Sequence, residues 1–413
     1  MKKQSNTPKI RFHNYKELWE CDDLKNIFGT IRNAFVGTAT PYYVEKGHFY
    51  LESNNVKNGK INYNSQIFIN DEFYEKQRDK WLKTNDIVMV QSGHVGHTAV
   101  IPKELNNTAA HALIVFTDYK KEVNPHFLNY QFQSSSKRKE LDLISTGNTI
   151  KHILASEMKS FKMDFPTVEE QSAIGSLFRT LDALLTSYKD NLANYQSLKA
   201  TMLSKMFPKA GEAVPEIRLD GFEREWKKSK LKDVAHRVQG NDGRMDLPTL
   251  TISASGGWMN QIDRFSANIA GKEQKNYTLL KKGELSYNHG NSKLAKYGVV
   301  FELQDYEEAL VPKVYHSFRV NQLADAKFIE IMFSTKIPDR ELGKLISSGA
   351  RMDGLLNISF DDFMNIKIII PSLPEQQAIG SYFSKLDQLI TSYQEKITQL
   401  ETLKKKLLQD MFI

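Results

Sequence analysis

The chain has 413 residues, which at about 150 residues per domain predicts two to three domains. Hydrophobic residues make up 40% and charged residues 25%, a composition that supports packed cores and excludes wholesale disorder. Cys21 is the only cysteine, which excludes a disulfide framework, a cysteine-rich zinc module and an iron–sulfur cluster. The formal charge of +7 is compatible with a nucleic-acid partner. No apolar run is long enough to cross a bilayer, so we expect a cytoplasmic protein with no membrane segment.

In chain order, a P-x-I-R segment at Pro8 leads into a divergent region, and a long segment that is shared between two halves follows. The same order repeats from Pro215. Residues 166–207 align with residues 371–412 without a gap at an offset of 205, and 19 of these 42 positions are identical, against about 2 or 3 expected by chance. We therefore predict a variable domain, a long helix, a second variable domain and a second long helix, at residues 1–165, 166–207, 208–370 and 371–413.

The two variable regions are predicted to be mixed α/β (α+β) domains. Short runs rich in β-branched and aromatic residues alternate with Gly, Asn and Asp turns, and we predict strands at residues 87–90, 112–116, 297–303 and 366–370. Because the domains differ in sequence while the shared segments are nearly alike, the helices are interpreted as doing one job twice and the domains as doing two different jobs.

Each shared segment begins with the signature of a helix start. Thr167 and Ser372 stand at the N-cap position, and Glu170 and Glu375 follow three residues later, which is the spacing of a capping box. The Glu-Gln pairs that begin at Glu170 and Glu375 are therefore interpreted first as a capping device and second as a docking surface.

The rest of each shared segment is predicted to be one helix of about 40 residues. Apolar residues recur at alternating steps of four and three over residues 174–195 and 379–400, the pattern of a coiled-coil seam, and we expect the two helices to pack antiparallel. Gly175 and Gly380 recur inside the helices and indicate a close helix–helix or subunit contact. The lysines at 404–406 are expected on the solvated face of the second helix.

The shared segments also carry a resemblance. The pattern P-x-x-x-E-Q-x-x-I-G-x-x-F-x-x-L-D at residues 166–182 and 371–387, followed by a long helix that ends in Met-Phe, resembles the specificity subunits of type I restriction-modification systems. The segments STGNTIKHI at 145–153 and SSGARMDGLL at 347–356 are similar to the family's glycine-containing segment ahead of each helix.

Two further segments resemble the loop inside each target recognition domain of that family. They read NDIVMVQSGHVGHTAVI at 85–101 and KGELSYNHGNSKLAKYGVV at 282–300. Asn85 departs from the usual glycine of the first loop, and residues 351–353 depart from a family-like Thr-x-Lys.

The resemblance implies two target recognition domains separated by two long helices that form an antiparallel coiled coil, with a pseudo-twofold internal repeat. It implies a non-catalytic subunit that binds a bipartite double-stranded DNA target and has no cofactor of its own. Two modification (methyltransferase) subunits would methylate adenine with S-adenosylmethionine, and restriction (translocase/nuclease) subunits would cleave. No Gly-Lys dipeptide is followed by Ser or Thr, so a P-loop is absent, and Asn124-Pro125 leads into His126 rather than a second proline.

Polar and basic residues of these loops are the candidate DNA contacts, since phosphates attract Lys and Arg while amides, hydroxyls and imidazoles suit base edges. An ordinary surface loop, or a solvated charge run at 137–139, is the alternative. His94 and His97 are three residues apart but lie in a glycine-broken loop without an acidic ligand, so no metal is expected. The candidates are Ser92, His94, His97, Lys137, Arg138, Asn148, Lys151, Asn288, His289, Asn291, Ser292, Lys293, Lys296 and Arg351.

Two other classes of function remain open from the sequence. A stand-alone DNA-modifying enzyme would need a nucleotide, metal or S-adenosylmethionine site that no motif indicates. A structural coiled-coil adaptor would explain the helices but would leave two large, dissimilar domains without a use.

Overall fold

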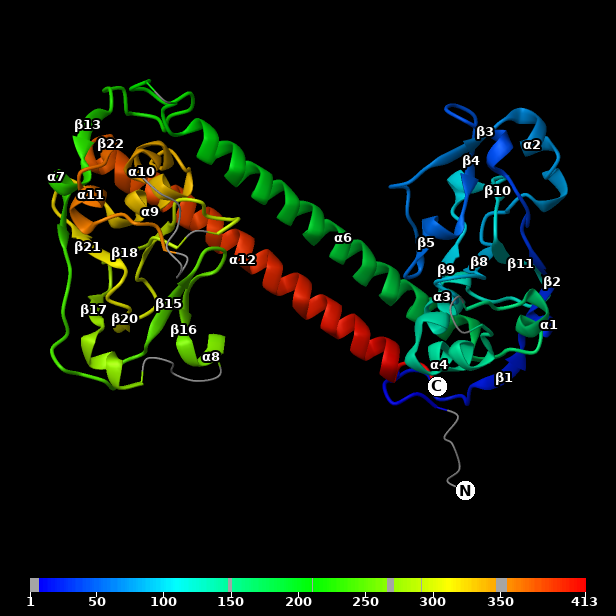
Figure 1. Cartoon of the computed structure of the whole chain (residues 1–413). Helices are drawn as coiled ribbons and strands as arrows, with labels where there is room; N and C mark the ends of the chain where they lie inside the picture. The colour runs from blue at the N-terminus through cyan, green and yellow to red at the C-terminus, as the bar shows by residue number, and fades with distance from the viewer. Residues whose placement is uncertain (1–6, 148–150, 210, 266–270, 291, 347–354) are drawn as a thin grey trace. The chain divides into compact units, whose positions relative to one another are not determined.

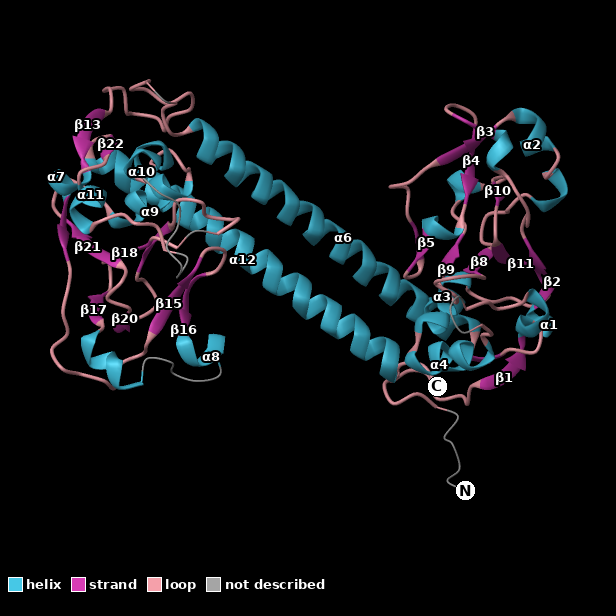
Figure 2. Ribbon diagram, viewed as in Figure 1, coloured by secondary structure: helices cyan, strands magenta, loops and turns pink. Residues whose placement is uncertain are grey.

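The computed structural model describes residues 7–147, 151–209, 211–265, 271–290, 292–346 and 355–413 (Figures 1 and 2). It contains two compact units, of which unit 1 comprises residues 1–190 with 394–413 and unit 2 comprises residues 191–393. Each unit holds one variable domain, the beginning of one long helix and the end of the other. No helix in the described ranges is both long and apolar enough to span a bilayer.

The two long helices have the predicted position and length. Helix α6 spans Val168–Lys205 and helix α12 spans Leu373–Asp410, so each has 38 residues and the offset between them is the predicted 205. The seam is buried most deeply near the start of each helix. In α6 these buried positions are Ile174, Phe178, Leu181 and Leu185.

Ion pairs show that the helices run antiparallel in each unit, as expected. In unit 1, the Lys404 ammonium near the end of α12 donates to Asp182 Oδ1 near the start of α6 at 2.6 Å. In unit 2, Lys199 pairs with Asp387 in the reverse sense. The second pair is the first one shifted by 205 positions on both sides. The pseudo-twofold repeat of the sequence is therefore also a repeat of contacts.

The domain of unit 1 is closed by an antiparallel ribbon that brings its beginning and end together. Strand β1 (Glu20–Asp23) pairs with β12 (Lys162–Phe165), and the central sheet has the order β2-β11-β8-β9. The sheet strands are β2 (Phe28–Asn33), β8 (Ile87–Val90), β9 (Thr98–Val100) and β11 (Leu113–Tyr119). The helices are α1 (Leu24–Ile27), α2 (Asp71–Glu75), α3 (Pro125–Gln133), α4 (Ser135–Ile144) and α5 (Ala155–Met158).

A second sheet of unit 1 has the order β10-β4-β7-β3, and a small hairpin lies beside the central sheet. The sheet strands are β3 (Tyr43–Val44), β4 (His48–Leu51), β7 (Ile67–Ile69) and β10 (Ala109–Ala110), and the hairpin strands are β5 (Val56–Lys57) and β6 (Lys60–Ile61). Short 3-10 helices η1 to η4 occupy Thr40–Tyr42, Ser53–Asn55, Arg78–Lys80 and Lys103–Leu105.

The domain of unit 2 repeats the ribbon and the central sheet. Strand β13 (Lys227–Lys230) pairs with β22 (Lys367–Ile370), and the sheet order β14-β21-β18-β19 matches that of unit 1. The sheet strands are β14 (Ala235–Arg237), β18 (Leu285–Asn288), β19 (Val299–Glu302) and β21 (His316–Val320). The helices are α7 (Leu231–Val234), α8 (Gln261–Phe265), α9 (Ala326–Ser334), α10 (Asp339–Leu345), α11 (Phe360–Met364) and the 3-10 helix η5 (Gly271–Asn276).

The two domains differ away from this common frame. In place of the second sheet of unit 1, unit 2 has two separate ribbons, formed by β15 (Leu250–Ser253) with β16 (Gly257–Asn260) and by β17 (Thr278–Lys281) with β20 (Glu308–Val311). The four predicted strands are confirmed as β8, β11, β19 and β22, and the mixed α/β class is confirmed with them.

The P-x-I-R segments tie one long helix to the other within each unit. In unit 1, the Ile10 N–H donates to the carbonyl of Asp410 at the end of α12. The next residue, Arg11, donates from Nε and Nη2 to the two oxygens of Glu170 at the start of α6, both at 2.7 Å. Unit 2 repeats the arrangement, with Arg218 on Glu375 at the same two distances. We call each such segment a strap.

The capping-box prediction is wrong for the glutamate side chains. The Glu170 N–H does donate to Thr167 Oγ1, at 3.4 Å, but the Glu170 carboxylate bonds Arg11 rather than the N-cap backbone. The reason is burial: Glu170 and Glu375 are 0% and 1% exposed, and a buried carboxylate is stabilised far more by a bidentate guanidinium than by one amide.

The neighbouring glutamines position the domains. Gln171 Oε1 accepts from the Asn124 N–H at 3.0 Å, and its Nε2 donates to the Pro166 carbonyl at 2.9 Å. Gln376 accepts in the same way from the Asp325 N–H at 3.0 Å. Both glutamines are buried, so the Glu-Gln pairs connect each helix to its own domain and offer no exposed docking surface.

The recurring glycines permit this approach. A Cβ on Gly175 would lie 2.9 Å from Oδ1 of Asn124, and one on Gly380 would lie 3.1 Å from Oδ1 of Asp325. Asn124 and Asp325 are the N-caps of α3 and α9, so the predicted close helix contact is confirmed.

We expect Arg218→Ala to lower the free energy of unfolding by about 3–5 kcal/mol, because it leaves the Glu375 carboxylate buried without its counter-ion. Urea denaturation followed by circular dichroism measures the effect. Arg224→Ala, at an exposed position of the same loop, is the matched control and should stay within about 0.5 kcal/mol of the unaltered chain. Equal losses in the two variants would contradict the role given to the strap.

Candidate nucleic-acid interface

The family-like loops occupy the same place in both central sheets. One joins β8 to β9 and the other joins β18 to β19. Each is hydrogen-bonded to the segment that precedes the long helix: in unit 1 the Gly93 N–H donates to the Lys151 carbonyl at 3.0 Å, and in unit 2 the Leu356 N–H donates to the His289 carbonyl at 2.8 Å. We call residues 91–97 with 151–153 loop pair 1, and residues 289–290 and 292–298 with 355–356 loop pair 2.

Five of the predicted contacts present their side chains to solvent on these loop pairs, and they are His94, Lys151, Ser292, Lys293 and Lys296. The Lys151 ammonium lies 2.9 Å from an exposed carboxylate of Asp142, and the Lys296 ammonium lies over the ring of Tyr297. An exposed ion pair such as that of Lys151 contributes little by itself, so its lysine can exchange the carboxylate for a phosphate. Their contact with DNA stays a prediction.

Other predicted residues shape the loops from within. Asn288 accepts from the Gly290 N–H at 3.1 Å and donates to the Ile252 carbonyl at 3.3 Å. The ring nitrogens of the buried His289 lie 2.7 Å and 2.9 Å from two backbone carbonyl oxygens. Ser92, half-buried, is bridged through its backbone to His152. The polar atoms of Asn288 and His289 are thus engaged within unit 2.

Lys137 occupies an interior position that its sequence context concealed. Its side chain is 5% exposed, and its ammonium lies 3.0 Å from Asp164 and 3.2 Å from Glu140. This placement argues against a phosphate contact and against a wholly solvated run, because the helical period of α4 turns Lys137 inward while Lys139 stays exposed.

His97 and Arg138 contact each other, so they are not two independent candidates for DNA contact. His97 Nδ1 accepts from the Asn58 N–H and lies 3.2 Å from Nη2 of Arg138. Burial, with the nearby charge of Arg138, lowers the pKa of His97 to about 4. The imidazole is therefore neutral near pH 7 and serves as an acceptor. Among the described residues, no group of three His, Cys, Asp or Glu is arranged to hold a metal ion.

Asn148, Asn291 and Arg351 lie outside the described residues.

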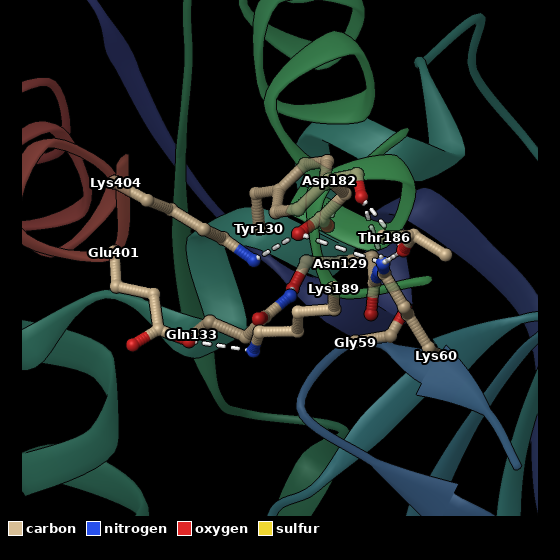
Figure 3. A network of polar contacts seen from close by, with 10 residues as sticks. All are labelled: Gly59, Lys60, Asn129, Tyr130, Gln133, Asp182, Thr186, Lys189, Glu401 and Lys404. Carbon is tan, nitrogen blue, oxygen red and sulfur yellow. Dashed lines mark hydrogen bonds and ion pairs between the residues drawn. The ribbon is translucent and has the colours of Figure 1, made fainter. Parts of the chain in front are cut away.

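The hairpin of β5 and β6 is a feature that the sequence reasoning missed. Asn58 and Gly59 form its two-residue turn with φ values of +50° and +82°, the conformation that favours Asn-Gly. The Gly59 carbonyl accepts from Asn129 Nδ2 at 2.9 Å, and the Lys60 ammonium donates to Thr186 Oγ1 at 3.2 Å (Figure 3). The Asn-Gly dipeptide was the available signal for the turn.

Asp182 is the centre of the polar network in Figure 3. Its Oδ2 accepts from the Tyr130 hydroxyl at 2.8 Å, and its Oδ1 accepts from Lys404 at 2.6 Å. Burial, then the Asp182 charge, raises the pKa of Tyr130. The expectation that Lys404 lies on a solvated face is wrong, because its position on α12 turns the ammonium toward α6 and leaves the side chain 15% exposed.

We expect His97 to make the stability of unit 1 depend on pH. Its folded pKa of about 4 lies below the ordinary 6.5, so between these values the unfolded chain binds a proton that the folded chain does not. Its contribution to stability is therefore complete above pH 6.5 and declines as the pH falls toward 4. His97→Gln should show a smaller drop in urea midpoint between pH 7.5 and pH 5 than the unaltered chain. An identical drop would contradict this placement of His97.

Comparison with known proteins agrees with this geometry. A family model described as the type I restriction modification DNA specificity domain matches residues 39–194 and 223–402. The EcoBI specificity subunit of a type I restriction enzyme from Escherichia coli is 24% identical over 223 residues, or 52% of this chain and 47% of that protein. The MjaVIII specificity subunit from Methanocaldococcus jannaschii is 21% identical over 340 residues, or 78% of this chain and 77% of that protein.

A solved structure shares the fold over nearly the whole chain. The S subunit of a type I restriction-modification system from M. genitalium superposes with a TM-score of 0.60 at 15% identity, covering 98% of this chain and 99% of that one. The family match covers both domains and most of both long helices, and each half carries the same frame. The chain therefore belongs to the family of type I restriction-modification DNA specificity subunits.

Proposed function

We propose that this chain recognises an asymmetric, bipartite target in double-stranded DNA and directs adenine methylation and restriction by partner subunits. As a member of the DNA specificity family it supplies recognition and is not itself the enzyme. The observation that supports the proposal most is that the closing ribbon and the central sheet occur in both units with the same strand order, while the loops between their strands differ.

The two loop pairs carry different chemistry at equivalent positions. Loop pair 1 exposes His94 and Lys151, whereas loop pair 2 exposes Ser292, Lys293 and Lys296. Different sets of donors and acceptors select different base edges in the major groove, while lysines supply phosphate contacts without sequence preference. Two such readers on one chain would specify two unlike half-sites.

The repeat of the ribbon and central sheet also supports the binding of two copies of the same partner subunit. Two modification subunits would each use the same kind of surface, one per half, and restriction subunits would join the assembly. The strap and the long helices recur in both units and are the parts that a partner could meet twice. We propose the cytoplasm as the site of action, and the partner subunits as the holders of S-adenosylmethionine and ATP.

Exchanging one domain should change one half of the target. The ribbon of β1 with β12 closes the first domain, so residues 24–161 can be replaced by the matching segment of a relative without altering the strap or α6. Mapping of N6-methyladenine in a host with the complete system should show one new half-site, with the other half-site and the spacer unchanged.

The reciprocal exchange is the control. Replacing residues 231–366, between β13 and β22, should change only the other half-site. A change in both half-sites after either exchange would show that the domains do not read independently.

The long helices are expected to set the spacer between the half-sites. Tyr195 and Tyr393 face each other in unit 2, so four helix-forming residues inserted both after Tyr195 and after Ser392 keep the antiparallel partners opposite. At about 1.5 Å per residue this adds about 6 Å, near two base pairs, and nearly preserves the helical phase. Methylome mapping should show a longer spacer between unchanged half-sites.

A paired insertion of two residues is the control, since it rotates each seam by roughly 200° and should destabilise the helix pair. An unchanged spacer in an active four-residue variant would show that another feature sets the distance.

A further inference from the structure

Unit 1 contains a basic hollow of about 890 Å³ that the loop pairs do not account for. Its walls come from the β5–β6 hairpin, from His97 at the end of loop pair 1, from α4, and from the unit 1 parts of α6 and α12. Six cationic and two anionic side chains line it. The cations are Lys57, Lys60, Arg138, Lys189, Lys404 and Lys405, and the anions are Asp182 and Glu401.

Half of these cations have acidic partners in the hollow. Lys60 and Lys404 lie within ion-pair distance of Asp182, and Lys189 lies 2.6 Å from Glu401. The other three have no carboxylate within ion-pair distance in the described part of the chain, and they are Lys57, Arg138 and Lys405. With six cations against two anions, the hollow carries an excess of positive charge.

Arg138 is the cation of the hollow that a bound anion would stabilise most. It is half-buried, burial lowers its pKa against the opposing charge of Asp142, and its guanidinium lies 3.2 Å from the neutral imidazole of His97. A partly buried charge with no carboxylate in direct contact is costly, and an oxyanion that enters from solvent lowers that cost. The planar guanidinium matches the geometry of a phosphate.

Unit 2 provides an internal comparison. Its hollow also lies against α6 and α12 and contains the equivalent pair Lys199 and Asp387, but its volume is about 310 Å³. Three lysines there are balanced by three acids, and the remaining lining is largely apolar. The charged members are Lys199, Lys327, Lys336, Glu330, Asp339 and Asp387. The same place in the repeat is therefore basic in one unit and balanced in the other.

We infer that the hollow of unit 1 receives a backbone phosphate of the bound DNA, held by Arg138, Lys57 and Lys405, and that unit 2 makes no equivalent contact. The inference rests on the proposed function. Since His97 joins the hollow to loop pair 1, the phosphate would lie beside the bases that this loop reads. Such a contact adds affinity and fixes position without selecting sequence.

The salt dependence of DNA binding tests the inference. The full chain is purified with its modification subunits. It is titrated at several salt concentrations against a duplex that contains the target sequence found by methylome mapping, and against a duplex of scrambled sequence. Lys57→Gln, Lys405→Gln and Arg138→Gln should each reduce the slope of log K against log salt, and the triple variant should reduce it by about 0.9 because the three cations hold one phosphate, with the preference for the target unchanged. Lys336→Gln, from the hollow of unit 2, is the matched control and should keep the original slope.

Arg138→Lys distinguishes loss of the positive charge from loss of folding. It keeps the charge, so its slope of log K against log salt should equal that of the unaltered chain even if Arg138→Gln lowers thermal stability. Slopes of Lys57→Gln and Lys405→Gln equal to that of Lys336→Gln would overturn the inference. So would loss of the modification subunits from the purified Lys57→Gln complex at an unchanged slope, since an acidic protein surface would then occupy the hollow. Absence of any preference for the target in the unaltered complex would instead refute the proposed function.

Discussion

The buried pair of an arginine and a glutamate at the start of each long helix is the contact on which the rest of the fold depends. Each strap is hydrogen-bonded to the end of one long helix and places its arginine on a glutamate at the start of the other, at 2.7 Å to both carboxylate oxygens. A carboxylate in such a place requires its counter-ion, so the strap cannot leave without a large loss of stability. The adjacent glutamine then holds the N-cap of α3 or α9, and a glycine one turn later allows the close approach. One short motif thereby joins two helices and a domain.

This arrangement separates what is constant from what varies. The strap and the ribbon occur in both units, and the central sheet has the same strand order in both. The second sheet of unit 1, the two separate ribbons of unit 2 and the loop side chains differ. A frame of this kind keeps the contacts of the glutamines to α3 and α9 while the loops on it change, which suits a protein that reads two unlike DNA half-sites. The basic hollow shows the same separation. Asp182 and Asp387 occupy equivalent positions in the two units, whereas the side chains around them differ in charge.

Local patterns were enough to predict the elements but not the partners of their polar groups. The seam and the N-terminal signals placed both long helices, and short runs rich in β-branched residues placed β8 and β22, because these features depend on neighbouring residues. Glu170 was assigned to a cap, yet its partner Arg11 lies 159 positions away. Lys137 and Arg138 are adjacent but face different surroundings, since the phase of α4 on the sheet decides which one is buried. The hairpin that lines the hollow reaches α6 across 126 positions, which no local pattern reveals.

We propose that one chain reads two unlike half-sites at a set distance. Mapping N6-methyladenine across the genome of a host that carries this chain with its partner subunits tests that claim most directly. The account predicts a single asymmetric motif with two specified halves, an unspecified spacer of constant length between them, and a methylated adenine in each half. A contiguous motif, a palindrome, or a spacer that varies from site to site would contradict it.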